Sequence, residues 1–428
     1  MAAIEVQPVR GTRDFYPEDM RLREWLFGHW RAVAESFGFE AYDACVLEHE
    51  DLYIRKAGDE ITGQLYNFED KGGRRVALRP ELTPSLARMV IARQGSMALP
   101  LRWYGIPQCF RYERMQRGRK REHFQWNMDV VGLDTVAAEV ELMTAQVTFL
   151  RRVGIDVDAG EVVLKVSDRR VLQGFLASLG ITGEAFAATC VVVDKLDKIG
   201  PEKTAAELAA LEIDASTAQR IIEVLGMDGI DALSAAVGAD NPGVASLREL
   251  LSLAEAAGIG AAVRIDPSVV RGLSYYTGTV WEVFAAVGEF RRAIAGGGRY
   301  DQLLETLGGK PAPMVGFGLG DVPIMEFLTE LDRLPELPGR IDDVVYPMDS
   351  DAFAVATRVA TYLRGQGRHV AVDYSNRRFK HVIARAEADG AQRLLVLGAR
   401  EIAEGVAKVR LLGDAKEEQV IALQDLGC

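Results

Sequence analysis

The chain has 428 residues, of which 48% are hydrophobic and 26% are charged, and this length and composition predict a globular protein of two or three domains. Its formal net charge of -12 at pH 7 argues against a protein that coats nucleic acid by bulk electrostatics, so an RNA site must be a local basic region. We find no secretory signal, no run of roughly 18 apolar residues and no CxxC pair, and therefore expect a cytoplasmic protein without a membrane span or a zinc site.

The first part of the chain predicts a long helix followed by strands. Apolar residues recur at helical spacing from Asp14 to Phe37, and a strand-like segment follows from Phe39 to Leu47. Val76 to Leu78 reads as a strand that ends in the turn Arg79-Pro80-Glu81, and Leu82 to Arg93 then reads as a helix.

A long antiparallel hairpin with a basic loop is predicted next. Leu101 to Tyr112 and Phe124 to Leu133 are strand-like, and the segment between them, Glu113 to His123, is rich in arginine and lysine around Gly118.

The remainder predicts a helical insertion, the rest of the sheet and a small C-terminal domain. Residues 167–259 are rich in Ala and Leu at helical spacing. Strand character returns in four segments: Ala262 to Ile265, Val269 to Phe284, Phe290 to Ala295 and Met314 to Leu319. From residue 341, short strands at Asp343 to Tyr346, His369 to Val372, Arg393 to Leu397 and Ala407 to Leu412 alternate with helices. The expected class is α+β, with a mainly antiparallel sheet of six or seven strands and domains at 1–166, 167–259, 260–333 and 341–428.

Arg111 and Glu113 are the first candidates for chemistry. Two residues apart on a strand, they would share one face of the sheet. A guanidinium there could clamp a nucleotide phosphate in a bidentate way. The alternative is an ordinary cross-strand salt bridge.

Gln125, Asn127 and Asp129 alternate along the returning arm and would form a polar row on one sheet face. A solvated face would account for such a row, because antiparallel sheets often leave one side wet. A polar ligand lying on the sheet is the other explanation.

Two glycine-rich segments follow. Arg271 to Thr279 combines a cation, two glycines and the pair Tyr275-Tyr276, although tyrosines on strands are often only packing. Gly316, Gly318 and Gly320 alternate, so a flat ring could rest on that face of the strand. A dinucleotide fingerprint has a different spacing, which weakens the hypothesis of a nucleotide oxidoreductase.

Taken together, these motifs resemble histidyl-tRNA synthetases over nearly the whole chain. The start, Arg10 to Pro17, is similar to that of the family, and the helix and strand after it resemble class II motif 1, which implies a homodimer. Leu78 to Pro84 resembles the substrate loop, in which Glu81 and Thr83 would hold the histidine amino group.

The hairpin resembles class II motif 2. By that resemblance Arg111 binds the ATP α-phosphate, and Gln125 and Asp129 bind histidine. The residues that would bind ATP with Arg111 are Glu113, Arg119, His123, Gly318 and Gly320. The residues that would contact the acceptor end of the transfer RNA are Arg114, Arg117 and Lys120. His123 stands where relatives often place the phenylalanine that stacks on adenine, with Phe124 next to it, so either ring could stack.

Arg271 to Thr279 resembles the signature peculiar to the family, in which Arg271 stabilises the reacting phosphate while Tyr275 and Tyr276 grip the imidazole. Motif 3 departs from the pattern, because the arginine that binds the γ-phosphate falls at about Pro323. The candidate substitutes are Arg119, Arg291, Arg292 and Arg299.

The resemblance implies a histidine–tRNA ligase. With ATP and Mg²⁺ it would convert L-histidine to the adenylate, stabilising charge electrostatically rather than through a covalent intermediate. It would then transfer histidine to the 3′ end of histidine tRNA, with the C-terminal domain reading the anticodon. The alternative is a histidine-sensing regulatory subunit of ATP phosphoribosyltransferase, which the missing motif 3 arginine favours and the C-terminal domain opposes.

Overall fold

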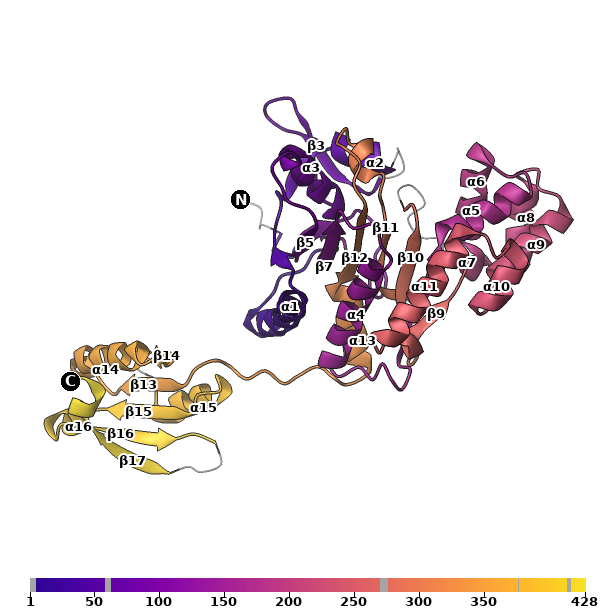
Figure 1. Ribbon diagram of the computed structural model, residues 1–428. Coiled ribbons are helices and arrows are strands. Elements are labelled where there is room, and N and C mark those ends of the chain that lie inside the picture. The colour runs from indigo at the N-terminus through magenta and orange to yellow at the C-terminus, as the bar shows by residue number, and fades with distance from the viewer. Residues whose placement is uncertain (1–4, 58–62, 270–275, 376, 414–416) are drawn as a thin grey trace. The chain divides into compact units, whose positions relative to one another are not determined.

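The computed structural model describes residues 5–57, 63–269, 276–375, 377–413 and 417–428 (Figure 1). The chain forms two compact units. One holds Arg23–Leu334 with the segment up to Phe15, and the other holds Pro335–Cys428 with Tyr16–Leu22. Within the described ranges, no helix combines the length and the apolar character needed to cross a membrane.

The first unit is built on one large sheet. Its strands are β1 (Glu40–Ala41), β5 (Leu101–Gly105), β6 (Gln108–Phe110), β7 (Glu122–Val131), β8 (Val162–Asp168), β9 (Val263–Ile265), β10 (Thr279–Ala285), β11 (Ala293–Arg299) and β12 (Met314–Gly320). They lie in the order β1-β5-β7-β12-β11-β10-β8-β9, and β6 also pairs with β7. Among the described strands of this sheet, only the β1–β5 and β8–β9 pairs are parallel. This confirms a mainly antiparallel sheet, with nine strands rather than six or seven.

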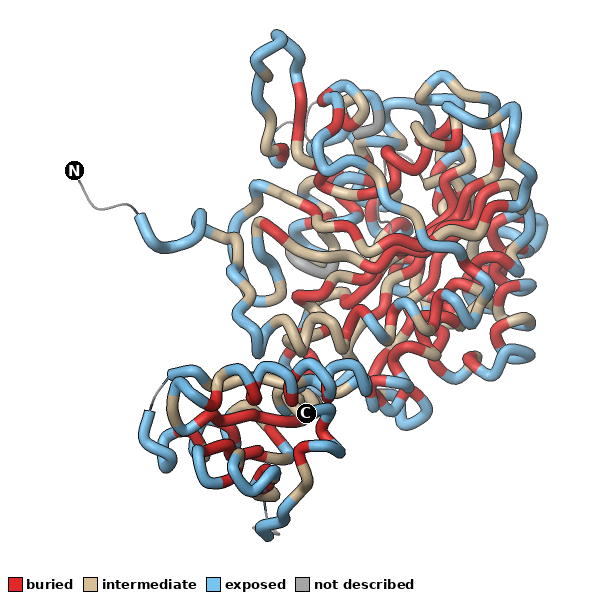
Figure 2. The backbone as a smooth tube through the Cα atoms, turned by 90° about the vertical axis from the view of Figure 1, so that its left-hand side faces the viewer, coloured by how far each residue is buried: buried red, intermediate tan, exposed pale blue. Residues whose placement is uncertain are grey.

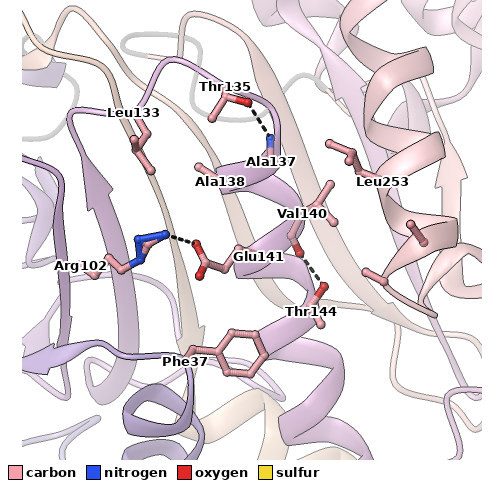
Figure 3. Close-up of a pocket in the computed structure, with 12 residues that line it drawn as sticks. Phe37, Arg102, Leu133, Thr135, Ala137, Ala138, Val140, Glu141, Thr144 and Leu253 are labelled. Carbon is pink, nitrogen blue, oxygen red and sulfur yellow. Dashed lines mark hydrogen bonds and ion pairs between the residues drawn. The ribbon is translucent and has the colours of Figure 1, made fainter.

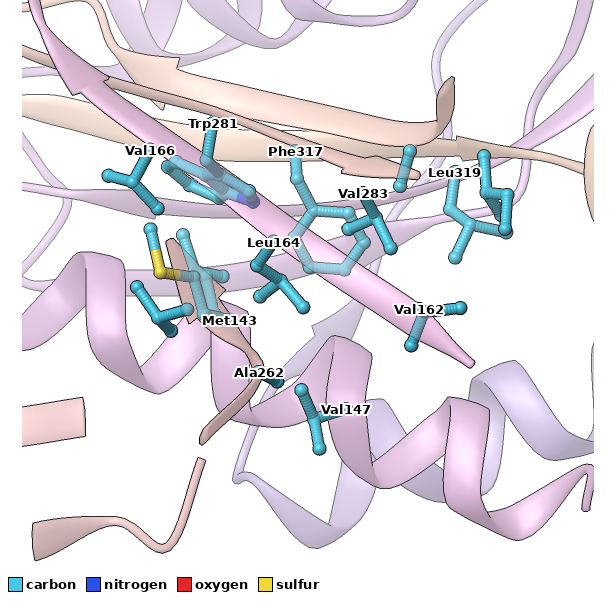
Figure 4. Close-up of a cluster of buried hydrophobic side chains, with 14 of the residues drawn as sticks. Met143, Val147, Val162, Leu164, Val166, Ala262, Trp281, Val283, Phe317 and Leu319 are labelled. Atoms are coloured by element: carbon cyan, nitrogen blue, oxygen red, sulfur yellow. The ribbon is translucent and has the colours of Figure 1, made fainter. Parts of the chain in front are cut away.

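One face of the sheet is covered by helices, chiefly α1 (Pro17–Ser36) and α4 (Ala137–Arg152). Trp281 and Phe317 point from the strands into this layer, where they meet Met143 and Val147 of α4 (Figure 4). The indole Nε1 of Trp281 donates to Oε1 of the buried Gln146, at 2.8 Å, so the ring carries no unpaired donor into the core. Figure 2 shows the buried strands running through the centre of this unit.

The opposite face is partly covered by α2 (Asp51–Ala57), α3 (Thr83–Arg93), α12 (Leu303–Thr306) and a small antiparallel sheet. That sheet has the order β2-β4-β3, with β2 at Leu47–His49, β3 at Tyr66–Glu69 and β4 at Arg75–Leu78. Leu86 and Val90 of α3 pack on Val131 and Met314 of the large sheet. This second face therefore has an apolar wall at one end.

Helices fill most of residues 169–256. They are α5 (Arg169–Ser178), α6 (Gly183–Val193), α7 (Leu196–Ile199), α8 (Pro201–Ala209), α9 (Ala215–Leu225), α10 (Ile230–Val237) and α11 (Pro242–Ala256). The predicted helical character is confirmed, although Ser167 and Asp168 still belong to β8. Figure 1 shows α11 beside the sheet edge formed by β10, β8 and β9.

The second unit has a five-stranded sheet in the order β14-β13-β15-β16-β17. Its strands are β13 (Asp343–Pro347), β14 (Val370–Val372), β15 (Arg393–Leu397), β16 (Val406–Leu411) and β17 (Glu418–Ala422). Its helices are α14 (Phe353–Gly365), α15 (Phe379–Ala388) and α16 (Ala399–Ala403). Buried residues of α14 and α15 belong to two separate apolar clusters of this sheet. The small α/β domain is confirmed, and β17 is an addition to the predicted strands.

Four strand predictions need correction. Where one strand was expected from Phe39 to Leu47, the structure has two short strands in different sheets, β1 and β2. The strand expected at Leu101 to Tyr112 is split into β5 and β6, because Pro107 has no N–H to donate to the ladder. The strand expected from Val269 begins only at Thr279 among the described residues. The strand expected at Phe290 to Ala295 instead begins at Ala293 and continues through the three glycines to Arg299. A Cβ at Gly297 would lie 2.6 Å from the carbonyl oxygen of Gly316, so only glycine fits at this position of the strand.

Candidate active site

The floor of the site is formed by β7 and β12 on the face away from α4. Gln125, Asn127 and Asp129 lie opposite Gly320, Gly318 and Gly316 in the register of these two strands. A Cβ at Gly318 would overlap the amide of Gln125, and a Cβ at Gly316 would overlap the carboxylate of Asp129. The glycines thus accommodate polar side chains lying across the sheet, rather than leaving a bare surface for a ring.

The polar row is not a solvated face, because Asn127 and Asp129 are buried and Gln125 is half-buried. Asn127 is 4% exposed and Asp129 is 1% exposed. The Oδ1 atom of Asn127 and the Oε1 atom of Gln125 are buried, and neither accepts a hydrogen bond from any residue in the described ranges. Leaving a buried acceptor unpaired costs about 1–3 kcal/mol. These two atoms therefore indicate a ligand that brings its own donors.

Aromatic rings surround the Asp129 end of the row. The hydroxyl of Tyr300 donates to Oδ1 of Asp129. The ring of Tyr276 lies over Gly298, and its centroid is 6.3 Å from that of Tyr300. Burial, and then the charge of Asp129, raise the pKa of Tyr42 well above its ordinary value. A carboxylate among rings suits a small cationic or hydrogen-bonding ligand. Tyr300 was not among the site residues expected from the sequence.

Glu81 and Thr83 are held by the turn between β4 and α3. Arg79, only 2% exposed, donates from Nε to the carbonyl oxygen of Gln108 at 2.9 Å and pairs through Nη1 with Asp43 at 2.7 Å. Leu82 fills the space above Gly105, which pairs with Asn127. The turn therefore lies over the same sheet face as the polar row. Arg79 was also missed, because its partners are distant in sequence.

Arg111 and Glu113 lie beyond the end of β6, so their expected placement on one strand is wrong. The Nε atom of Arg111 donates to the carbonyl oxygen of Pro80 at 2.9 Å, which ties the hairpin to the substrate turn. Glu113 pairs with Arg119 and not with Arg111. Among the residues that the structure describes, Arg111 makes no ion pair, and its charge is available to an anion.

The choice between His123 and Phe124 is decided by the faces of β7. Phe124 belongs to the helix-covered face, where its ring centroid is 5.1 Å from that of Phe27 and 5.0 Å from the Arg23 guanidinium carbon. His123 has the parity of Gln125 and Asp129, and therefore lies on the site face. His123 is the ring that can meet a ligand on the floor.

His123 is uncharged at neutral pH. Burial, and then the charges of Arg111, Arg13 and Arg119, lower the pKa of His123 to about 3. An unfolded chain would protonate this residue near its ordinary pKa of 6.5. The stability that the neutral ring contributes is therefore complete above pH 6.5 and is lost progressively as the pH falls below that value.

We expect His123→Phe to reduce this pH dependence, because phenylalanine fills a similar volume and does not titrate. The wild type should lose more unfolding free energy between pH 7 and pH 5 than the variant does. Urea denaturation at the two pH values measures both losses. Equal losses would contradict the low pKa of His123.

The basic loop is divided between free and paired cations. Arg114 and Lys120 are exposed, and within the described ranges neither makes an ion pair or a side-chain hydrogen bond. Arg117 instead pairs with Glu330 at 2.6 Å and Glu326 at 3.4 Å, both on α13 (Asp321–Glu330). Arg114 and Lys120 are thus better placed to meet another molecule than Arg117.

The N-terminal segment supports the base of this loop. Arg13 pairs with Glu122 at 3.1 Å and with Asp321 at 2.9 Å, and Asp321 in turn accepts the backbone N–H of Phe124 at 2.9 Å. Burial raises the pKa of Asp321, an effect that Arg13 opposes. This network joins β7 to the start of α13.

Arg271 and Tyr275, expected to act on phosphate and imidazole, lie outside the described residues.

A separate cavity of about 520 Å³ lies among α4, α11 and β5 (Figure 3). Val140, Leu133 and Leu253 are among its lining residues, and the Arg102–Glu141 ion pair of 3.0 Å forms part of its wall. It adjoins helix α4, on the side of the sheet away from the polar row, and is not part of the candidate site.

The antiparallel sheet, its buried polar row and the arginines at one end define a class II aminoacyl-tRNA synthetase domain. The model of the histidyl-tRNA synthetase family matches residues 11–321, and an anticodon-binding domain model matches residues 343–427. The chain belongs to the histidyl-tRNA synthetase family, and the family's use of ATP extends to it.

Individual relatives agree with this assignment. A histidine–tRNA ligase, chloroplastic/mitochondrial, of Arabidopsis thaliana is 47% identical over 99% of this chain and 86% of its own length. A crystal structure of histidyl-tRNA synthetase from Nostoc sp. PCC 7120 matches with a TM-score of 0.81 and 25% identity over 99% of each chain. An ATP phosphoribosyltransferase regulatory subunit/histidyl-tRNA synthetase from Bacillus halodurans has a TM-score of 0.77 at 20% identity, over 93% of this chain and all of that one. The last likeness shows the fold alone.

Proposed function

We propose that this chain is a histidine–tRNA ligase that activates L-histidine with ATP on the polar row of β7 and then transfers it to histidine tRNA. The observation that carries the proposal is the pair of unsatisfied buried acceptors, Gln125 Oε1 and Asn127 Oδ1, between an acidic aromatic end and a cationic end. At roughly 3.3 Å per residue, the row from His123 to Asp129 spans about 20 Å, enough for an amino acid and a nucleotide side by side.

Histidine would occupy the Asp129 end. Asp129 and Tyr276 would hold the imidazole, and Gln125 the rest of the amino acid. Glu81 and Thr83, on the turn above the same face, would hold the ammonium group. A site whose buried polar groups pair with the substrate rejects analogues that lack those groups by large factors, which supports histidine selectivity.

ATP would occupy the His123 end. His123 would stack on adenine with Glu113 beside it, while Arg111 would bind the α-phosphate and Arg119 would neutralise further phosphate charge. Gly320 would border the nucleotide, whereas the space above Gly318 is taken by the Gln125 amide and not by a ligand ring. Glu282 lies on the site face of β10 opposite Gly296, and one carboxylate with phosphate oxygens is a donor set that suits Mg²⁺, which would neutralise phosphate charge.

Transfer RNA would meet both units. Arg114 and Lys120 would contact the phosphates of the acceptor end, with a smaller part for Arg117, and such contacts position the strand without reading its sequence. The domain at 343–427 would read the anticodon.

We also propose a homodimer formed through α1 and β1, because β1 is an edge strand of the large sheet. Light scattering should then give twice the chain mass of 46.9 kDa, and a monomer would contradict the interface.

The cytoplasm is our proposed compartment, since all four cysteines are free thiols. Imaging of a tagged chain in its own cell would test that, and an organellar signal would contradict it.

A histidine-sensing regulatory subunit is the second candidate, favoured by the proline at the motif 3 position. The anticodon-binding domain at 343–427 and the uncompensated Arg111 favour the ligase, because sensing histidine requires neither.

Histidine-dependent exchange of labelled pyrophosphate into ATP tests the proposal. We expect exchange with the wild type and at least about a 100-fold loss with Gln125→Ala, which removes a contact to the reacting amino acid. Histidine binding without exchange would reject the ligase and leave the regulatory candidate.

A further inference from the structure

The cation that binds the terminal phosphate of ATP is missing from its usual position. α13 reads DVPIMEFLTE, so it carries no arginine or lysine, and Pro323 stands where the motif 3 arginine is expected. ATP carries several negative charges on its β- and γ-phosphates, and a water-poor site must neutralise them. Another residue must supply that charge.

Arg299 cannot supply it. Its side chain is directed to the helix-covered face, where Nε and Nη2 each lie 2.7 Å from the buried carboxylate of Glu139. The carbonyl oxygens of Leu133 and Thr135 and the carboxylate of Asp301 accept its remaining donors. If Arg299 moved toward a ligand, the buried Glu139 carboxylate would be left without a counter-charge, which is strongly unfavourable.

Arg291 is also unsuitable. It is exposed, and its Nη1 donates to the carbonyl oxygen of Gly288 at 2.7 Å. Because it is solvated and already hydrogen-bonded to its own loop, its charge is screened and would gain less from a phosphate than that of a half-buried cation.

Arg292 differs from both. It directly precedes β11, and its side chain runs beside the tip of the basic loop, where a Cβ at Gly118 would lie 3.3 Å from its Cδ. It is half-buried and makes no ion pair or side-chain hydrogen bond within the described ranges. Burial, and then the like charge of Arg119, lower the pKa of Arg292, while Glu113 opposes them.

Around the basic loop and the segment before β11, arginine side chains outnumber the carboxylates that pair with them within the described ranges. Glu113 is taken by Arg119, and neither Arg111 nor Arg292 has an acidic partner within the described ranges. Arg119 and Arg292 are neighbouring guanidiniums, and Glu113 is the one carboxylate that interacts with both among the residues described. An anion of more than one charge would therefore stabilise the pair.

We propose that Arg292, together with Arg119, binds the β- and γ-phosphates of ATP in place of the missing motif 3 arginine. The inference rests on the proposed ligase function, because that function supplies the ATP. It assigns to the segment before β11 a role that the family pattern gives to α13. Pyrophosphate leaves from the same position, so Arg292 also neutralises the leaving group.

The test compares Arg292→Ala with Arg292→Lys and with the neighbouring control Arg291→Ala. Removing a charge-assisted phosphate contact should raise the KM for both ATP and pyrophosphate about 10- to 100-fold. The lysine variant should recover part of that loss, and Arg291→Ala should stay within about twofold of the wild type. The KM for histidine should not change, which a general disturbance of the site would not produce.

Direct binding separates this inference from the proposed function. Measured by calorimetry, Arg292→Ala should weaken the binding of ATP. The binding of AMP and of a stable histidyl-adenylate analogue should be unchanged, because these ligands lack β- and γ-phosphates. Equal losses for ATP and AMP, or no loss for ATP, would overturn the inference. Absence of exchange in the wild type would instead reject the ligase function, while the preference for ATP over AMP would still decide the role of Arg292.

Discussion

Gly316→Ala should abolish histidine activation while leaving ATP binding nearly intact. The added Cβ would overlap the Asp129 carboxylate and lie 2.7 Å from the hydroxyl of Tyr300. Neither group can retreat, because Asp129 is 1% exposed and Tyr300 is 2% exposed in a packed wall. Displacing a binding carboxylate by about 1 Å can cost 100-fold in rate, so kcat/KM for histidine should fall at least that much.

Pyrophosphate exchange at varied histidine and at varied ATP measures the two effects separately. Gly365→Ala is the matched control, since Gly365 lies in α14 of the second unit with no heavy atom within 4 Å of an added Cβ. That variant should equal the wild type in activity. Thermal denaturation must show Gly316→Ala folded, and unchanged kcat/KM for histidine in the folded variant would remove Asp129 from the histidine site.

The strand parities of the site could be predicted from sequence because they are local. The alternation of Gln125, Asn127 and Asp129 with apolar residues fixes which side chains share a face, and the structure confirms their common face. The same rule failed for Arg111 and Glu113, since pairing with β7 resumes after Pro107 only from Gln108 to Phe110, and β6 ends before either residue.

The contacts that complete the site could not be predicted, because they join distant segments. Tyr300 is hydrogen-bonded to Asp129, 171 residues away in sequence, and Arg79 to Asp43, 36 residues away. A single sequence has no pattern that records such pairs. The four candidate cations likewise looked equivalent in sequence, and only their partners separate the buried Arg299 from the uncompensated Arg292.

The contrast between these two arginines leads to the prediction with the largest effect on stability. Arg299→Met should lower the unfolding free energy of the first unit by about 3–5 kcal/mol, the usual cost of removing one partner of a buried ion pair. Glu139 is 0% exposed and would lose both hydrogen bonds from the guanidinium. The double variant Arg299→Met with Glu139→Leu should recover much of this loss, because apolar residues of similar volume leave no buried charge.

The loss of unfolding free energy in Arg299→Met should also depend on pH, and the burial of Glu139 determines whether it grows or shrinks as the pH rises. Burial raises the pKa of Glu139, and Arg299 opposes that rise. Without Arg299, the folded pKa should lie further above the unfolded value near 4.3, so the folded state favours the protonated acid. Stability is then retained below that unfolded value and lost as the pH rises toward the folded pKa, which makes the variant weaker at pH 8 than at pH 5. Urea denaturation of the three proteins at both pH values measures this, and a loss below about 1 kcal/mol at pH 8 would mean that the pair is not a buried support of the sheet.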